Sequence, residues 1–180
     1  MIRVYLLVLG MGFGVFAQDR LRMADGKEWM ARNVDVVLPG SYCYGNDPAN
    51  CRKYGRLYVW AEAGRACAAA GGGWRLPTDA EWRRLAMAYG GVSADSEDNG
   101  RAAYAALLVG GRSGFAAVLG GGRAGTGEYG RADAHGFFWT ATEDGAGGVF
   151  YYNFGKGGLA LHRQDGGEKA RAFSVRCVRD

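Results

Sequence analysis

The chain has 180 residues, of which 48% are hydrophobic and 13% aromatic, and a formal net charge of +4. This length predicts one domain with a substantial core. Because the basic residues are scattered among acidic ones, we do not expect the protein to bind nucleic acid. The 32 glycines indicate many loops and tight turns, more than a helical bundle would need.

Residues 1–17 have the pattern of a secretory signal peptide. Arg3 precedes an apolar run that is too short to span a bilayer, and Val15 and Ala17 occupy the small-residue positions of a cleavage site. The residue directly after the cleavage site is Gln18 rather than Cys, so no lipid anchor is expected there. We expect residues 18–180 to form a single domain that is secreted, periplasmic or displayed on the cell surface, without a transmembrane segment.

Four cysteines remain after the signal peptide, at Cys43, Cys51, Cys67 and Cys177. An even number of cysteines in an exported chain favours disulfides over free thiols. No C-x-x-C motif occurs and the two histidines lie far apart, so neither zinc nor another cofactor is expected.

The first elements are short. Asp25 and Gly26 predict a hairpin turn between two brief strands. Residues 39–55 are rich in Gly, Asn, Asp and Pro, which predicts a loop. Cys43 and Cys51 close a short ring inside this loop.

Residues 56–73 predict the first main helix, which has Cys67 on its inward face and ends in a glycine run. Residues 172–180 predict a final strand in which Phe173 and Cys177 share the inner face. Because both cysteines point inward, we favour a bridge between Cys67 and Cys177, which leaves the two earlier cysteines to pair with each other.

The stretch GWRLPTDAEWRRL, residues 73–85, is a candidate active site or a structural bracket. Thr78 and Glu81 fit the S/T-x-x-E capping box, which predicts a second helix beginning after Thr78. Trp82 and Leu85 fall on the buried stripe of this helix. Since the acidic residues already have a structural role at the positive end of the helix, we interpret the stretch as a bracket.

The middle of the chain offers little chemistry. Residues 93–100 resemble the start of a calcium loop, but its twelfth position is Ala106 rather than Glu, so we predict a solvated loop. Residues 100–111 predict a short third helix. Residues 114–136 are glycine-rich and predict an irregular region, and their GGGR segment is not followed by the G-K-[ST] of a phosphate loop.

The hydrophobic period changes to two near the C-terminus, which predicts strands at residues 137–143, 148–154, 158–163 and 172–178. In the second of these strands Phe150, Tyr152 and Phe154 share one face, and Tyr151 and Asn153 share the other. We expect one face of this sheet to join the core and the other, with its turns, to be open.

Six segments follow the order found in a known family: KEWMARNVDV, CYGNDPANCRKYGRLYVWAEA, GWRLPTDAEW, SGFAAVLGGGR, FFWTATE and SVRCVRD. From about residue 26 to its end the chain resembles the Fibrobacter succinogenes major paralogous domain. This resemblance implies a relation to the formylglycine-generating (sulfatase-modifying) enzymes. It also implies an α+β, C-type-lectin-like fold with two main helices, a glycine-rich irregular loop region and a small antiparallel C-terminal sheet. In such folds a long disulfide commonly joins the first helix to the last strand.

The resemblance does not carry catalysis over to this chain. The formylglycine-generating enzymes bind copper with a reactive cysteine pair near the C-terminus, where this chain has Cys177 alone. No Ser-His-Asp grouping can be nominated, and the calcium-lectin triplets EPN, QPD and WND are absent. We therefore expect no catalytic residues, no metal and no cofactor.

The favoured hypothesis is a secreted or cell-surface binding module that recognises a polysaccharide, or an envelope or host protein, through the open face of the C-terminal sheet. Aromatic side chains would supply contact area there, and polar side chains hydrogen bonds. The candidate ligand-binding residues are Trp139, Glu143, Tyr151, Asn153, Lys156, His162, Arg163 and Gln164. Of these, Trp139 also fits a core position, because it precedes a threonine-rich strand.

Two alternatives remain open. The chain could be a structural or assembly protein of the cell envelope, or a copper-dependent oxidase of the formylglycine-generating type. Thiol titration separates the oxidase from the others, because the oxidase requires two free thiols.

Overall fold

A computed structural model describes residues 20–180. The predicted signal peptide, residues 1–17, lies outside the described residues. None of the helices within 20–180 is long and apolar enough to cross a membrane.

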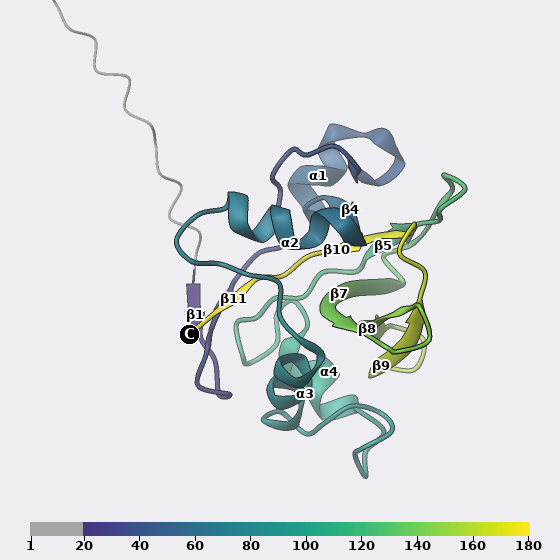
Figure 1. The fold of residues 1–180 in the computed structure, drawn as a ribbon. Helices are drawn as coiled ribbons and strands as arrows, with labels where there is room; N and C mark the ends of the chain where they lie inside the picture. Colours follow the sequence, from purple (N-terminus) through teal and green to yellow (C-terminus); the bar gives the residue numbers. More distant parts are fainter. Residues whose placement is uncertain (1–19) are drawn as a thin grey trace, which may run out of the picture.

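Short strands make up most of the ordered backbone in the described part of the chain (Figure 1). The strands are β1 (Arg20–Arg22), β2 (Glu28–Met30), β3 (Ser41–Tyr42), β4 (Leu57–Val59), β5 (Gly120–Arg123), β6 (Tyr129–Ala132), β7 (His135–Glu143), β8 (Val149–Gly155), β9 (Ala160–Gly167), β10 (Ala172–Ser174) and β11 (Val178–Arg179). The helices are η1, a 3-10 turn (Tyr44–Asn46), α1 (Pro48–Tyr54), α2 (Trp60–Ala69), α3 (Asp79–Met87) and α4 (Arg101–Leu107).

The strands form two sheets. The larger sheet has eight strands in the order β3-β4-β10-β5-β7-β8-β9, with β6 paired to β5. It is mixed, because both β5 and β10 run parallel to β7 while the other pairs are antiparallel. The smaller sheet has the order β1-β2-β11.

This architecture corrects the expected fold. The expectation was an α+β, C-type-lectin-like fold with two main helices and a small antiparallel C-terminal sheet. The described residues instead form a β-rich structure with eleven strands, a large mixed sheet and four short α-helices of 7 to 10 residues.

The glycine-rich segment is the main source of this error. Residues 114–136 were predicted to be irregular, yet they contribute β5 and β6 to the large sheet. Glycines carry no alternating hydrophobic pattern, so periodicity cannot detect such strands. At Gly121 the close approach of the neighbouring strand requires glycine, because a Cβ there would lie 2.4 Å from the carbonyl oxygen of Gly130.

Three other boundaries differ from the prediction. The loop predicted at 39–55 contains β3, η1 and α1. The first main helix begins at Trp60, because residues 57–59 form β4 instead. The predicted strand at 172–178 divides into β10, in the large sheet, and the separate strand β11, in the small sheet.

The core lies on both sides of the large sheet. Neighbouring residues of β7 belong to different core clusters, Phe138 with Trp82 of α3 and Trp139 with Cys67 of α2. Figure 1 shows α2 on one side of the strands and α3 with α4 on the other. Because alternate side chains of a strand point to opposite faces, both faces of β7 are buried here.

The predicted covalent and local features are confirmed. Cys43 is bonded to Cys51 and Cys67 to Cys177, with Cα–Cα distances of 4.8 and 5.6 Å, and none of the four cysteines is free. β1 and β2 form the predicted antiparallel hairpin, whose turn uses Gly26 at a φ of 85°. The predicted third helix is α4.

Candidate functional site

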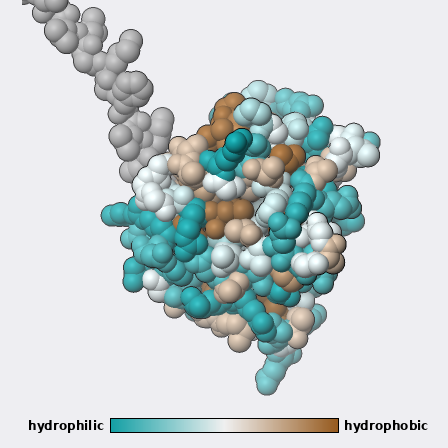
Figure 2. Space-filling model, viewed as in Figure 1, coloured by the Kyte–Doolittle hydropathy of each residue, from teal (hydrophilic) through white to brown (hydrophobic). Residues whose placement is uncertain are grey.

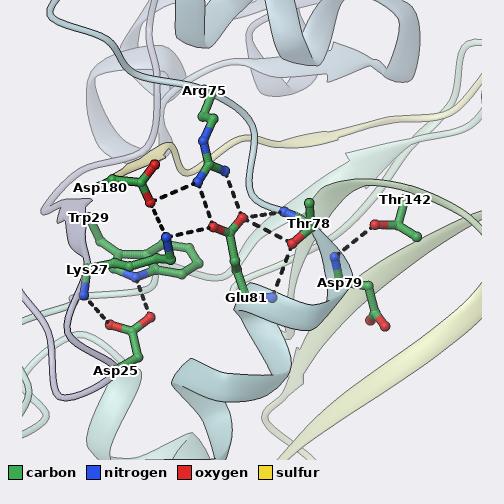
Figure 3. Close-up of polar contacts among 9 residues, drawn as sticks. All are labelled: Asp25, Lys27, Trp29, Arg75, Thr78, Asp79, Glu81, Thr142 and Asp180. Carbon is green, nitrogen blue, oxygen red and sulfur yellow. Dashed lines mark hydrogen bonds and ion pairs between the residues drawn. The ribbon is translucent and has the colours of Figure 1, made fainter.

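The stretch at residues 73–85 is a structural bracket. Thr78 and Glu81 form both hydrogen bonds of a capping box at the start of α3. Arg75 donates to the two carboxylate oxygens of Glu81, over 2.8 and 2.6 Å. Lys27, from the N-terminal hairpin, lies 3.2 Å from the same carboxylate and also pairs with Asp180 at the C-terminus (Figure 3). The bracket therefore joins three distant parts of the chain.

The carboxyl group at the centre of this bracket is held ionised. Burial opposes its charge, but the hydrogen bonds from Arg75, Thr78 and Lys27 prevail and lower the pKa of Glu81 to about 2. A general acid or base works best with a pKa near the operating pH. Glu81 is thus suited to holding the fold rather than to proton transfer near neutral pH.

The predicted open face exists on the large sheet. Tyr151 of β8 lies directly opposite Gln164 of β9, and Asn153 lies opposite His162. Directly opposed residues place their side chains on the same face. Tyr151, Asn153 and His162 are half-buried and Gln164 is exposed, so these four predicted residues share one partly accessible surface.

Two predicted residues are not part of this accessible surface. Trp139 lies opposite Tyr151 on the same face of the sheet but is buried there. Trp139 is 0% exposed, and its indole N–H donates to the carbonyl oxygen of Tyr58 over 2.8 Å. It is therefore a core residue, which corrects its assignment to the open surface. Arg163 extends from the opposite face and binds Asp79 of α3 with two hydrogen bonds of 2.8 Å.

The last two predicted residues are at the margins of the sheet. Glu143, at the end of β7, is exposed and pairs with Lys169 over 2.8 Å. Lys156 is exposed in the β8–β9 turn, and its backbone N–H donates to the carbonyl oxygen of Ala134. Neither the Glu143 nor the Lys156 side chain hydrogen-bonds to Tyr151 or Gln164.

One end of the open face carries two imidazoles. Nδ1 of His135 lies 2.9 Å from Oδ1 of Asn153, and Nδ1 of His162 lies 2.7 Å from Oγ of Ser93. Burial, helped by the nearby His135, lowers the pKa of His162, so this ring is neutral at neutral pH. The prediction omitted His135, although it begins the strand whose other residues were considered.

The centre of the face is aromatic. The rings of Phe137 and Phe173 are stacked with centroids 4.9 Å apart, and the Tyr151 ring lies 5.2 Å from Phe173 and 6.2 Å from Phe137. Burial raises the pKa of the Tyr151 hydroxyl, which therefore remains protonated and can donate a hydrogen bond.

A groove adjoins this aromatic centre. It encloses about 240 Å³ beside the β5–β6 hairpin and is partly open to solvent. Its lining residues are Gly122, Arg123, Ala124, Glu128, Tyr129, Gly130, Arg131, Phe137, Arg171 and Phe173. We call this set the arginine groove. The sequence analysis did not predict this groove, because most of its residues lie in the glycine-rich segment. The arginines that alternate with glycines in that segment were the one feature that could have indicated a binding site.

The rest of the visible surface is mostly hydrophilic. In the view of Figure 2, hydrophobic residues form small separate patches among hydrophilic ones. The large hydrophobic side chains that are exposed within residues 20–180 come from separate elements and loops: Val37, Met87, Val109 and Leu159. In the same residues, no group of three His, Cys, Asp or Glu side chains is placed to hold a metal ion.

Comparison with known proteins yields one similarity. A model of the Fibrobacter succinogenes major domain matches residues 23–179. The match begins at the N-terminal hairpin and ends in β11, so it includes the bracket, the open face and the arginine groove. No curated protein and no solved structure matches the chain.

Proposed function

The chain belongs to the Fibrobacter succinogenes major domain family, and we propose that it is a non-catalytic binding module that acts outside the cytoplasm and recognises a polysaccharide. The ligand lies across the open face of the large sheet, over the residues from the arginine groove to Gln164. We call this surface the binding face.

The observation that carries this proposal is the continuity of the binding face. The rings of Phe137 and Phe173 line the arginine groove and also contact Tyr151, which lies opposite Gln164. Phe173 is 4% exposed and supports the half-buried rings of Phe137 and Tyr151, which form the accessible part of this row. Such rings, flanked by amide and guanidinium groups, suit a sugar chain, because the rings pack against apolar sugar faces while the polar groups bind hydroxyls. An extended ligand can thus contact several strands at once.

The cysteines and acidic groups support a non-catalytic role. All four cysteines are used in disulfides, so no thiol pair remains to bind copper as an oxidase of the formylglycine-generating type would require. The most strongly perturbed carboxylate, Glu81, is engaged in the bracket. The two disulfides also favour an oxidising compartment outside the cytoplasm.

A panel of immobilised polysaccharides, both neutral and acidic, tests the proposal directly. The chain should bind at least one of them, and Tyr151→Ala and Gln164→Ala should each weaken that binding. Met87→Ala on α3 is the matched control, since Met87 is exposed on the other side of the sheet. Thermal unfolding of each variant separates loss of binding from loss of fold.

Two results would contradict the proposal. Binding that withstands both substitutions would place the ligand elsewhere on the molecule. Retention of an envelope or host protein, with no polysaccharide bound, would favour the protein ligand or the structural role in the envelope.

A further inference from the structure

We propose that the arginine groove binds the acidic sugar units of a polysaccharide, with the carboxylate or sulfate group held by Arg123, Arg131 and Arg171. This inference rests on the proposed polysaccharide-binding function and specifies its ligand class. Four observations carry it: the charge of the lining, the placement of the arginines, the aromatic floor, and a facing pair of glycines.

The charged residues of the lining are predominantly basic. Three arginines line the groove, against one acidic residue, Glu128. Guanidinium groups present paired N–H donors that match the two oxygens of a carboxylate or sulfate. An anionic ligand is therefore favoured over a neutral or cationic one.

Two of these arginines contact aromatic side chains. The guanidinium of Arg123 lies 4.2 Å from the ring centroid of Tyr42 and 5.8 Å from that of Tyr129. A guanidinium nitrogen of Arg131 lies 3.3 Å from Nε2 of His135. Neither arginine forms an ion pair within residues 20–180, although the carboxylate of Glu128 lies close enough to Arg123 to feel its charge. Both arginines can therefore still pair with an anion.

The backbone of Arg131 is unusual. Its φ is 67°, in the left-handed region that residues other than glycine rarely occupy. This interrupts the alternation of side chains along β6, so that Arg131 lines the groove together with its neighbour Gly130. Such local strain is commonly found at binding sites.

The third arginine, Arg171, forms a weak ion pair with an acidic neighbour. Arg171 pairs with Glu168 over 2.8 Å, and both side chains are largely exposed, at 46% and 64%. An exposed ion pair of this kind is weak. An incoming anion can therefore share or replace Glu168 as the partner of Arg171.

The groove floor suits a sugar ring. The half-buried ring of Phe137 is stacked there on Phe173, which is 4% exposed, with an angle of 25° between the two planes. The volume of about 240 Å³ is below the roughly 300–1,000 Å³ typical of pockets for drug-sized ligands. It therefore suits one unit of a chain that continues along the binding face.

The facing glycines keep this floor open. Gly122 of β5 and Gly130 of β6 are directly paired. A Cβ on Gly122 would lie 3.0 Å from the ring of Phe173, so packing explains that glycine. A Cβ on Gly130 would have nothing within 4 Å, and its φ is not in the left-handed region. Neither packing nor backbone conformation therefore requires glycine at position 130. A ligand in the groove would require it, because a side chain at this position would occupy the ligand's space.

The first experiment measures affinity for two matched pairs of polymers: polygalacturonate with its methyl ester, and dextran sulfate with dextran. Within each pair the backbone is constant and only the charge differs. We expect the acidic member to bind about tenfold or more tightly, and the difference to shrink as salt is raised from 50 to about 500 mM. Preference for carboxylate or sulfate then identifies the anion.

The second experiment compares variants of the groove. Arg123→Gln and Arg171→Gln should each weaken binding of the preferred acidic polymer by about tenfold. Arg84→Gln changes the same charge on the exposed face of α3 and should leave that affinity unchanged. Gly130→Val should weaken binding by filling the groove, yet keep or raise the melting temperature, because valine suits a strand better than glycine.

The outcomes separate this inference from the function on which it rests. Equal binding of the charged and uncharged polymers, still reduced by Tyr151→Ala, overturns the acidic-sugar assignment and leaves the binding module intact. Full binding by Gly130→Val likewise overturns it. Failure to bind any polysaccharide overturns both proposals.

Discussion

Arg163 of β9 holds both carboxylate oxygens of Asp79, with Nε and Nη2 each 2.8 Å from one oxygen. Asp79 is the first residue of α3, so this pair fastens the helix to the large sheet. The guanidinium also lies 3.9 Å from the ring centroid of Phe150. Arg163, a predicted ligand-binding residue, thus has a structural role on the face opposite to the binding face.

Replacing Arg163 should therefore affect stability rather than binding. Arg163→Gln should lower the free energy of unfolding by about 1–3 kcal/mol, because the Asp79 side chain, 14% exposed, loses its charged partner. Urea denaturation measures this change. Lys156→Gln, in an exposed turn, is the control and should stay within about 0.5 kcal/mol of the parent. If Arg163→Gln abolished polysaccharide binding without changing the free energy of unfolding, Arg163 would be a ligand-binding residue after all.

The bracket predicts a defined loss of stability in acid. The pKa of Glu81 is about 2 in the folded chain, against 4.5 for an ordinary glutamate. Because the folded pKa is lower, the ionised carboxylate stabilises the fold fully above pH 4.5. This contribution, at most about 3 kcal/mol, disappears as the pH falls from 4.5 toward 2.

Glu81→Gln isolates this charge, since glutamine can still complete a capping box. The difference in unfolding free energy between the parent and Glu81→Gln should be largest near pH 6 and should shrink toward pH 2. Glu97→Gln, in an exposed loop, should give no such trend. A constant difference across this range would show that the carboxylate is not stabilising through its charge.

The two disulfides should contribute unequally to stability. They close segments with sequence separations of 8 and 110 residues. Chain-entropy reasoning assigns about 2.5 kcal/mol to Cys43–Cys51 and about 4.8 kcal/mol to Cys67–Cys177. Guanidinium unfolding of the two paired Cys→Ala variants tests this order. A larger loss from removing the short ring would mean that local structure in residues 39–55 depends on its bridge.

Arg176 should be among the least replaceable residues of the core. It is 0% exposed, and its N–H groups make five hydrogen bonds, to Asn33 and to the backbone carbonyls of Met30, Phe115 and Ala116. Burial lowers the pKa of Arg176, so these neutral acceptors are what sustain its charge.

Lysine offers three donors in place of five, and methionine none. Arg176→Lys and Arg176→Met should each cost about 3–5 kcal/mol of unfolding free energy, because buried carbonyl groups lose their partners. Chemical denaturation measures this, with exposed Arg84→Lys as the near-neutral control. An Arg176→Met variant as stable as the parent would show that the hydrogen bonds can be dispensed with together.

Local chemistry allowed several features to be predicted from sequence. The capping box at Thr78 and Glu81 depends on residues three positions apart, and the hairpin turn at Asp25 and Gly26 depends on two adjacent ones. The bridge between Cys67 and Cys177 was predictable because each residue's inward direction follows from the period of its own element. The same reasoning placed Tyr151 and Asn153 on one face of their strand.

Tertiary structure decided the rest, because the determining contacts lie far apart in the chain. β5 and β6 have no hydrophobic period. β5 becomes a strand through pairing with β7 and β10, and β6 through pairing with β5. The predicted final strand divides because its two ends pair with β4 and β2 in different sheets. The sequence by itself determined the helix caps, the turns and the face of each strand on which a side chain lies. Long-range packing decided which segments pair, and hence where the arginine groove opens, because no local pattern encodes contacts between distant segments.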